Sequence, residues 1–315
     1  MKSDEGYMRS YCKNRFYTGL DIATKLWVGD YQNGDSFHDL AQDAGGIRRL
    51  AVLRADIDNL GQAFVSGFES EKHGQKYVTL SRTATFSRKL ALFFKLHVNT
   101  LLREGEYSLH VNDEAGLRKA TIVYSGGDDV FIIGAWDDII GFAVDLNDSL
   151  SDYAQGTLTI SAGIGIYPEK YPVAAMARQT GELEDASKAY PGKNAVTLFD
   201  ESGTYSWDEF INAVLAEKYE LIRDFFQTMQ DYGKSFLYRL LDLMRSRDEK
   251  INLARYAYLL ARMEPGEKAP DESKKLYQEF SQKMYQWMLD EKACKQAITA
   301  LYIYVYTIRE TAEGE

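Results

Sequence analysis

The chain has 315 residues, enough for two domains, and 45% of them are apolar, so each domain could bury a core of its own. The formal net charge of −10 argues against a free-standing nucleic-acid-binding protein with a basic face, although it allows a subunit that touches RNA mainly through partners. Two cysteines without metal-ligand spacing, no apolar run long enough to span a membrane and no recognisable signal peptide predict a cytoplasmic protein with no membrane partner.

The N-terminal part of the chain is predicted to lead into a strand that ends in carboxylates. Residues 1–46, rich in Gly, Asp and Tyr, are interpreted as a connector. An apolar stretch begins near residue 49 and runs to Asp56, Ile57 and Asp58. Asp58 precedes a helix-type stretch and is interpreted as a helix N-cap. A longer helical pattern follows at about residues 76–102.

The most informative feature of the chain is the sequence SGGDD at residues 125–129. Apolar runs precede and follow it, and two β-type runs joined by a glycine pair predict a hairpin. Asp128 and Asp129 would then lie next to each other between strands, where carboxylates are costly unless a cation binds them. On this segment alone, a solvated turn that happens to contain Asp and Gly explains the residues equally well.

The order of the predicted elements decides between these two interpretations. A strand that ends at Asp56, then a helix, then the hairpin form a β-α-β-β unit, which places Asp56 opposite Asp128 and Asp129 at one edge of a sheet. Carboxylates in this arrangement can hold two divalent ions for phosphoryl or nucleotidyl transfer. Mg²⁺ suits such a site because it prefers hard oxygen ligands and leaves positions open for phosphates.

Four further elements complete the first domain. They are a helix at residues 137–152, a strand at 157–166, a helix from about Pro172 to Tyr190, and a strand at 195–199. The resulting order, β-α-β-β-α-β with one extra helix and strand, predicts an α+β ferredoxin-like palm at residues 47–203.

The second domain is predicted to be an all-α helical bundle at residues 204–315. Ser206 and Glu209 have the spacing of a capping box before its first helix. A proline-containing break at residues 265–270 precedes two final helices, at about 271–290 and 292–309. No catalytic constellation is recognisable in this half.

Palms with a glycine pair and two acidic residues on the central hairpin resemble nucleotide cyclases and diguanylate cyclases. The present sequence is most similar to the large subunit of type III CRISPR effector complexes, which act in antiviral defence, and within them to the Csm type. The segments that carry the resemblance, in order, are LWVGDY at 26–31, LRADIDNLG at 53–61, YSGGDDVF at 124–131, GKNAV at 192–196 and ARYAYLLAR at 254–262. The resemblance spans nearly the whole chain and places it at the C-terminal portion of such a subunit, with the second palm and the helical domain.

The resemblance implies an activity and a set of site residues. Members of this family make cyclic oligoadenylates from ATP when a guide RNA captures a target transcript. By resemblance, Asp56, Asp128 and Asp129 hold two Mg²⁺ or Mn²⁺ ions, the backbone carbonyl of Ile57 adds a ligand, and no side chain is needed as a base. The residues that the resemblance places around the ATP are Ser125, Gly126, Gly127 and Lys193. Lys188 and Lys193 can equally be solvated surface residues.

The resemblance also implies partners. Full-length members usually carry an N-terminal HD nuclease, a first palm and a zinc-binding insertion, which are not expected in this chain, and the dipeptide His38-Asp39 is interpreted as a coincidence. In the family the ATP pair lies between two palms, so this palm is expected to supply half of a composite site. The expected partners are the N-terminal half with the first palm, the repeat-handle-binding subunit, the small subunits, and, through the complex, guide RNA and target RNA.

Two other functions remain open from the sequence. A standalone dinucleotide cyclase of the diguanylate type would need a homodimer and guanine-reading groups, which are not identifiable. A catalytically silent palm could serve only as a scaffold of the complex; the intact Asp56, Asp128 and Asp129 argue against it, but the missing half of the site keeps it open.

Overall fold

The computed structural model describes residues 10–13, 23–26, 28–69, 72, 74–110, 116–229 and 234–309. They form two compact units: a palm unit, with the described residues up to Ala44 and then Arg48–Thr204, and a helical unit, with Gly45–Ile47 and the described residues from Tyr205 onward. Residues 28–44, part of the predicted connector, thus lie in the palm unit. None of the helices in the described part of the chain is both long and apolar enough to cross a membrane.

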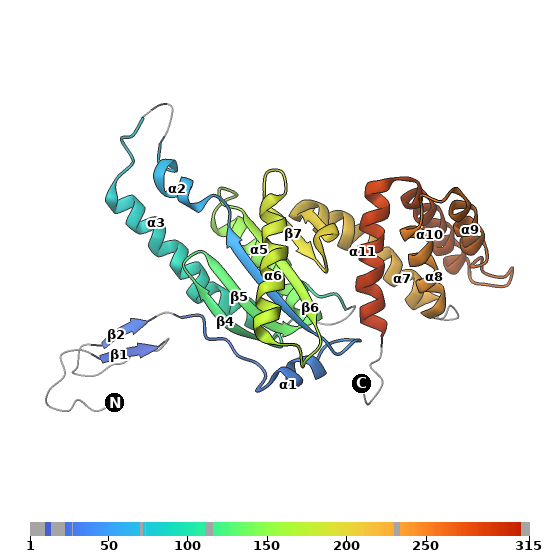
Figure 1. The fold of residues 1–315 in the computed structure, drawn as a ribbon, viewed down its shortest axis with the longest axis horizontal. Helices are drawn as coiled ribbons and strands as arrows, with labels where there is room; N and C mark the ends of the chain where they lie inside the picture. Colours follow the sequence, from blue (N-terminus) through green and yellow to red (C-terminus); the bar gives the residue numbers. More distant parts are fainter. Residues whose placement is uncertain are drawn as a thin grey trace. The chain divides into compact units, whose positions relative to one another are not determined.

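The palm unit is built on a mixed sheet with the strand order β4-β5-β3-β6-β7 (Figure 1); β8, which follows β7 in this order, begins at Thr204, the last residue of the unit. The strands are β3 Leu50–Ile57, β4 Ala120–Gly126, β5 Asp129–Ala135, β6 Ile160–Tyr167, β7 Ala195–Leu198 and β8 Thr204–Ser206. The pairs β3–β5, β3–β6 and β4–β5 are antiparallel, and β6–β7 is parallel. The four strands β4-β5-β3-β6 have the ferredoxin-like order, so the predicted fold class is confirmed.

The helices of the palm unit are α1 Phe37–Gln42, α2 Leu60–Ser66, α3 Leu80–Leu92, the π-helix η1 Phe93–His97, α4 Val98–Arg103, α5 Trp136–Tyr153, α6 Val173–Ala189 and the short 3₁₀ helix η2 Glu201–Gly203. The parallel pair β1 Ser10–Lys13 and β2 Ala23–Leu26 precedes them. The single helix predicted at residues 76–102 is therefore a shorter α3 that continues through a π-helical turn into α4. A π-helix shifts the side chains that follow it by about one position around the axis, which sequence periodicity does not reveal.

Helices cover both faces of the sheet, and β3 is therefore buried along almost its whole length. On the face of Leu50 and Val52, α1 and α6 pack through Leu40 and Met176 (Figure 1). The helices α4 and α5 pack on each other, and α5 also contacts β3, β5 and β6. The approach of α6 is close, since a Cβ added to Gly163 of β6 would lie 2.4 Å from the backbone nitrogen of Glu184.

The outer strand β4 is covered along its first half by the segment at residues 31–33. The Tyr31 carbonyl accepts from the Ile122 amide at 3.0 Å, and the Asn33 amide donates to the Ala120 carbonyl at 2.9 Å. The register of β4 then shifts between Ile122 and Tyr124. Pairing and a bulge are two of the usual ways to protect an edge strand.

A buried ion pair fixes the segment that enters β4. Arg118 and Asp145 are both buried and in direct contact. The Arg118 guanidinium also donates to the Tyr107 carbonyl at 2.9 Å, and Asp145 accepts the amides of Glu106 and Tyr107.

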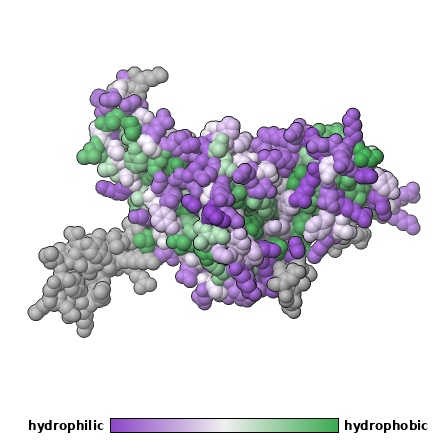
Figure 2. Space-filling model, viewed as in Figure 1, coloured by the Kyte–Doolittle hydropathy of each residue, from purple (hydrophilic) through white to green (hydrophobic). Residues whose placement is uncertain are grey.

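The helices α2 and α3 carry exposed apolar side chains. Val65 is 74% and Leu80 86% accessible, and apolar side chains are visible there in Figure 2.

The helical unit contains the π-helix η3 Glu209–Tyr219 and the helices α7 Glu220–Thr228, α8 Lys234–Arg245, α9 Lys250–Ala261, α10 Asp271–Leu289 and α11 Glu291–Ile308. Phe225 stacks on Phe280 at a centroid distance of 3.8 Å in its core. Only half of the predicted capping box forms: the Glu209 amide donates to the Ser206 hydroxyl at 3.2 Å. The Glu209 carboxylate instead accepts from the Gln296 side chain at 2.6 Å.

Candidate nucleotide site at the glycine hairpin

The strand register places three of the predicted site residues in one row. Asp56 of β3 lies directly opposite Asp129 of β5, and Asp129 lies directly opposite Gly126 of β4. Residues that face each other across antiparallel strands project to the same side of the sheet. Asp56, Asp129 and the position of Gly126 therefore share one face, which we call the acidic face; it is the face that α6 packs against, through Arg54 and Glu184.

The turn of the hairpin explains why glycine stands at its first central position. Gly127 has a φ of 73°, and Asp128 follows it with an ordinary negative φ, so the two-residue loop fits a type II′ turn. The Ile57 amide donates to the Asp128 carbonyl at 3.1 Å. This bond holds the tip of the hairpin against the end of β3, which keeps Asp56, Asp128 and Asp129 near one another.

The acidic face concentrates negative charge at Asp129. Burial raises the pKa of this carboxyl, Asp128 and, to a smaller extent, Asp56 raise it further, and the Tyr124 hydroxyl lowers it by hydrogen bonding. In the described part of the chain no Lys, Arg or His side chain forms an ion pair with Asp128 or Asp129. The repulsion at this point is therefore uncompensated by the protein's own cations.

Asp56 differs, because it belongs to a chain of alternating charges. Lys188 of α6 lies 2.8 Å from Asp56 and 2.6 Å from Glu184, and the other oxygen of Glu184 lies 3.1 Å from Arg54. Burial alone would lower the pKa of the Lys188 ammonium, but the hydrogen bonds to Asp56 and Glu184 outweigh it and raise the pKa. The Lys188 ammonium thus occupies the position of a cation against Asp56.

An open pocket lies on the acidic face between the strands and α6. Its lining includes Arg54, Tyr124, Asp129, Phe131, Ala177 and Glu184. It offers carboxylate, guanidinium, hydroxyl and aromatic groups, a mixture that suits a polar ligand with a planar ring.

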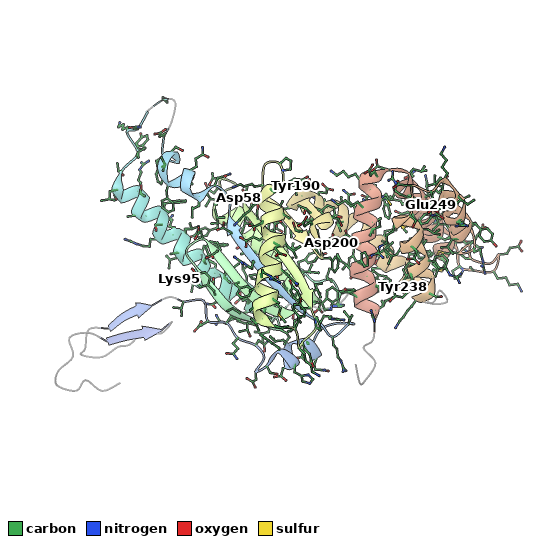
Figure 3. The ribbon with its side chains drawn as sticks, in the orientation of Figure 1. Asp58, Lys95, Tyr190, Asp200, Tyr238 and Glu249 are labelled. Carbon is green, nitrogen blue, oxygen red and sulfur yellow. The ribbon has the colours of Figure 1, made fainter. Side chains whose placement is uncertain are left out.

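The structure places Lys193 near the end of β3, beside Asn59. Its ammonium donates to the Asn59 side chain at 2.9 Å. The turn that carries it is held by Asp58, whose carboxylate accepts from the Asn194 amide at 3.0 Å and from the hydroxyls of Thr159 and Ser161 at 2.8 and 2.7 Å. Figure 3 labels Asp58 and Tyr190, which lie at this end of the sheet.

The interpretation of Asp58 as a helix N-cap is wrong. Asn59 occupies the N-cap position of α2, with a left-handed backbone and no capping hydrogen bond from its side chain. Asp58 is instead a buried anchor that joins β3, β6 and the Lys193 turn. Its burial was not predictable from β3 alone, because the three donors come from residues about 100 or more positions away.

Ser125 does not join the carboxylates. It precedes Gly126 in β4 and therefore projects to the opposite face, where its hydroxyl donates to the Phe94 carbonyl of η1 at 2.5 Å. A contact between Ser125 and a substrate remains a prediction, as does coordination by the Ile57 carbonyl. Within the part of the chain that the structure describes, His38 contacts Glu169 at 2.8 Å, and Asp39 accepts from the Ser36 hydroxyl at 2.9 Å.

The donor set fits a divalent cation, although no group of three or more His, Cys, Asp and Glu side chains is gathered closely enough for one within the described residues. The evidence for the fit is the chemistry at Asp129, a half-buried carboxyl whose pKa is raised first by burial and then by two neighbouring carboxylates. A hard cation would relieve that repulsion. Sequence reasoning missed Glu184 and Arg54; the spacing of Glu184 and Lys188 along one helix was the available signal.

The chain is similar to proteins of one family over most of its length. Residues 49–197 match the second palm domain of Cas10/Cmr2, and residues 223–310 match the second helical domain of the Cmr2 subunit of the CRISPR RNA silencing complex. The chain is 47% identical over 305 residues to the protein of Mycobacterium tuberculosis named CRISPR system single-strand-specific deoxyribonuclease Cas10/Csm1 (subtype III-A), and 42% identical over 316 residues to the Streptococcus thermophilus protein of the same name. These matches cover 96% and 98% of this chain but only 37% and 39% of the relatives.

A solved structure shows the same fold. The chain is similar to the Csm1 chain of a crystal structure described as a Csm1-Csm4 cassette in complex with one ATP, with a TM-score of 0.71 and 25% identity. The match covers 96% of this chain and 43% of that one.

Proposed function

Because this chain belongs to the Cas10/Csm1 family of type III-A CRISPR large subunits, of which it contains the second palm and a helical domain, we propose that its palm polymerises ATP. The proposed products are cyclic oligoadenylate second messengers, made by two-metal nucleotidyl transfer when target RNA binds. The palm acts as half of a composite two-palm site. The other palm comes from the remainder of the large subunit, since this chain spans less than two fifths of the relatives' length.

One observation supports the proposal above the others: Asp56 and Asp129 face each other across two strands, Asp129 lines an open pocket, and Asp128 lies at the adjoining turn. A palm that served only to support neighbouring subunits would gain nothing from like charges directly opposite each other, which destabilise a sheet. The ATP bound in a similar Csm1-Csm4 cassette supports ATP as the substrate.

Asp56, Asp128 and Asp129 are the residues that would hold Mg²⁺ or Mn²⁺. When bound, the ions lower the pKa of an attacking ribose hydroxyl and neutralise charge on the transferred phosphate. The protein's own part is to orient and to hold charge: Asn59 fixes the Lys193 ammonium at 2.9 Å, and Glu184 keeps Lys188 beside Asp56 at the edge of the pocket. Both are ammonium groups that can meet phosphates as point charges.

We also propose the partners of the family for this chain. They are Csm4-type and small effector subunits, the N-terminal half of the large subunit, and guide and target RNA reached through the assembled complex; Csm4 is named with Csm1 in the similar solved structure. The nuclease activity in the relatives' name belongs to those longer proteins, and we assign it to no residue of the described part of this chain.

A silent scaffold is the second candidate function, and a specific observation favours it. Lys188 already neutralises Asp56, so the palm does not need a metal at that carboxylate to be stable. A diguanylate-type cyclase has no such support, because no guanine-reading group is recognisable around the pocket.

Incubation of the chain with radiolabelled ATP and Mg²⁺ or Mn²⁺ tests the proposal, with and without the N-terminal half of the large subunit, guide RNA and target RNA. Target-dependent adenylate oligomers should form only in the full mixture. The double variant Asp128→Ala with Asp129→Ala should form none, whereas the control Asp271→Ala with Glu272→Ala, which removes two exposed charges from the first turn of α10, should behave as the unaltered chain. Equal product from the Asp128/Asp129 double variant would refute the assignment. If no form makes product and none binds ATP in a metal-dependent way, the scaffold function is favoured.

A further inference from the structure

Lys95 lies on the π-helix η1, beside the outer strand β4 (Figure 3). This short helix is held on both sides. Its Phe94 carbonyl accepts the Ser125 hydroxyl, and its Lys95 carbonyl accepts the Asn99 amide group at 3.1 Å. Asn99 is itself buried and binds the segment that follows Val28, accepting the amides of Asp30 and Tyr31 at 3.0 Å each. The backbone that carries Lys95 is therefore fixed relative to the glycine hairpin.

The side chain of Lys95 reaches to the front of Gly126. A Cβ added at Gly126 would lie 3.6 Å from Cε of Lys95 and 3.8 Å from the hydroxyl of Tyr124. Because Gly126 is directly opposite Asp129, that added atom would project onto the acidic face. Lys95 thus passes around the edge strand and approaches the acidic face from the side opposite to α6.

Lys95 and Tyr124 leave a space in front of Gly126 that has a donor on each side. The Tyr124 hydroxyl already bonds the Gly126 carbonyl at 3.1 Å, and the pKa of this phenol is raised, chiefly by the charge of Asp129. The absence of a side chain at Gly126 opens this space next to Asp129. Any larger residue would extend into it, between the lysine stem and the phenol.

The charge of Lys95 is available, in contrast to the other lysines near the site. Lys188 is engaged by Asp56 and Glu184, and Lys193 is bonded to Asn59. Among the residues that the structure describes, no carboxylate forms an ion pair with Lys95. Lys95 is half-buried on a fixed backbone, and its side chain approaches Gly126, the residue directly opposite Asp129. This position suits a phosphate that a metal on Asp129 would also bind.

We propose that Lys95, together with the Tyr124 hydroxyl, binds the phosphates of the nucleotide in front of Gly126. The inference rests on the proposed function, because it takes the substrate of that site to be a nucleoside triphosphate. It assigns the glycine a purpose beyond its turn: position 126 stays open so that a phosphate can lie between the ammonium and the acidic face.

Binding measurements on the full 315-residue chain with Mg²⁺ test this inference. A fluorescent ATP analogue is bound first and then displaced by ATP, by inorganic triphosphate or by adenosine. The variant Lys95→Ala should weaken displacement by ATP and by triphosphate about tenfold, the usual effect of losing one hydrogen bond to a charged group, and leave adenosine unchanged. Lys95→Arg should restore part of the loss. Lys89→Ala, which removes an exposed lysine from the preceding helix α3, is the matched control and should have no effect.

The outcomes separate this inference from the proposed function. If Lys95→Ala binds triphosphate as the unaltered chain does, while the Asp128/Asp129 double variant loses metal-dependent binding, the role of Lys95 is refuted and the proposed function stands. If the unaltered chain binds no ATP with Mg²⁺, both fail. If Lys95→Ala weakens displacement by adenosine as much as displacement by triphosphate, the lysine maintains the shape of the site and does not bind the phosphate, which also refutes the inference. The variant Lys95→Gln, whose side chain is closer to lysine in length, then checks that the loss in Lys95→Ala does not come from misfolding.

Discussion

The substitution Asp129→Asn is expected to stabilise the metal-free chain while it weakens the stabilisation of the chain by Mg²⁺. Asp129 faces Asp56 across β3 and β5, next to Asp128, and no cation of the described residues pairs with it. Asparagine keeps the shape and the hydrogen-bonding capacity of the side chain but removes its charge. The only large change is therefore the loss of one member of a like-charged cross-strand pair.

The size of the effect follows from that pair. Cross-strand pairs contribute roughly 0.2–1 kcal/mol, and like charges directly opposite each other destabilise by a similar amount. Removing one charge from the Asp56–Asp129 pair should therefore raise the free energy of unfolding by up to about 1 kcal/mol. For a unit of this size that corresponds to a rise in Tm of at most about 2–4 °C.

The effect should depend on pH in a definite direction. The pKa of Asp129 is raised in the folded chain above its unfolded value, first by burial and then by Asp128, so ionising this group costs stability. That cost is absent below the unfolded pKa of about 3.9, grows as the pH rises through the folded pKa, and is complete at neutral pH. The difference in Tm between Asp129→Asn and the unaltered chain should be present at pH 7 and vanish in acid.

Thermal unfolding followed by circular dichroism, in EDTA and in Mg²⁺, measures both parts. Mg²⁺ should raise the Tm of the unaltered chain more than that of Asp129→Asn, because binding to the folded state alone stabilises it. Asp185→Asn, an exposed carboxylate on α6, is the control for losing one negative charge from the same unit. A lower Tm for Asp129→Asn than for the unaltered chain at pH 7 in EDTA would contradict the reasoning, since it would mean that the carboxylate makes net favourable contacts.

Three further predictions concern the rest of the chain. Arg118→Met leaves the buried Asp145 carboxylate without its cation and should cost about 3–5 kcal/mol in urea unfolding; replacing Asp145 by Leu at the same time should recover part of the loss, and no recovery would contradict this account. Asp58→Ala removes the acceptor of three donors, one of them the buried Ser161 hydroxyl, so it should cost roughly 2 kcal/mol and speed hydrogen exchange at the Asn194 amide, whereas unchanged exchange would show that the turn is held otherwise. Burial raises the pKa of Tyr304 to about 12, so its contribution to the stability of the helical unit is complete below pH of about 10 and is lost as the pH rises toward that value; Tyr304→Phe should shift alkaline unfolding, measured by circular dichroism, to higher pH, and an unshifted midpoint would count against it.

Much of the palm could be predicted because its signals are local. The glycine pair between two apolar runs predicts the β4–β5 hairpin, and the position of Asp56 at a strand end needed only the order of the elements. Topology then supplied the register in which Asp56 meets Asp129. These residues were identified without any knowledge of side-chain contacts, although their role in binding metal remains a prediction.

The remaining parts of the site depend on contacts that no local pattern contains. Asp58 has the spacing of an N-cap, but its donors come from β6 and from the turn after α6, so tertiary contacts override the local preference. Lys95 is an ordinary position in a helical pattern until η1 rotates it toward Gly126. Glu184 pairs with Arg54 only because α6 packs closely on the sheet at Gly163.

The covered edge of the palm sheet limits how two palms can meet. The backbone groups of the first half of β4 are already paired with residues 31–33, and the bulge beyond Ile122 breaks the ladder that a further strand would need. A second palm cannot join at β4 by extending the sheet into one continuous structure. A partner palm that approached this edge would have to recognise side chains, so its fit would depend on sequence rather than on a free strand edge.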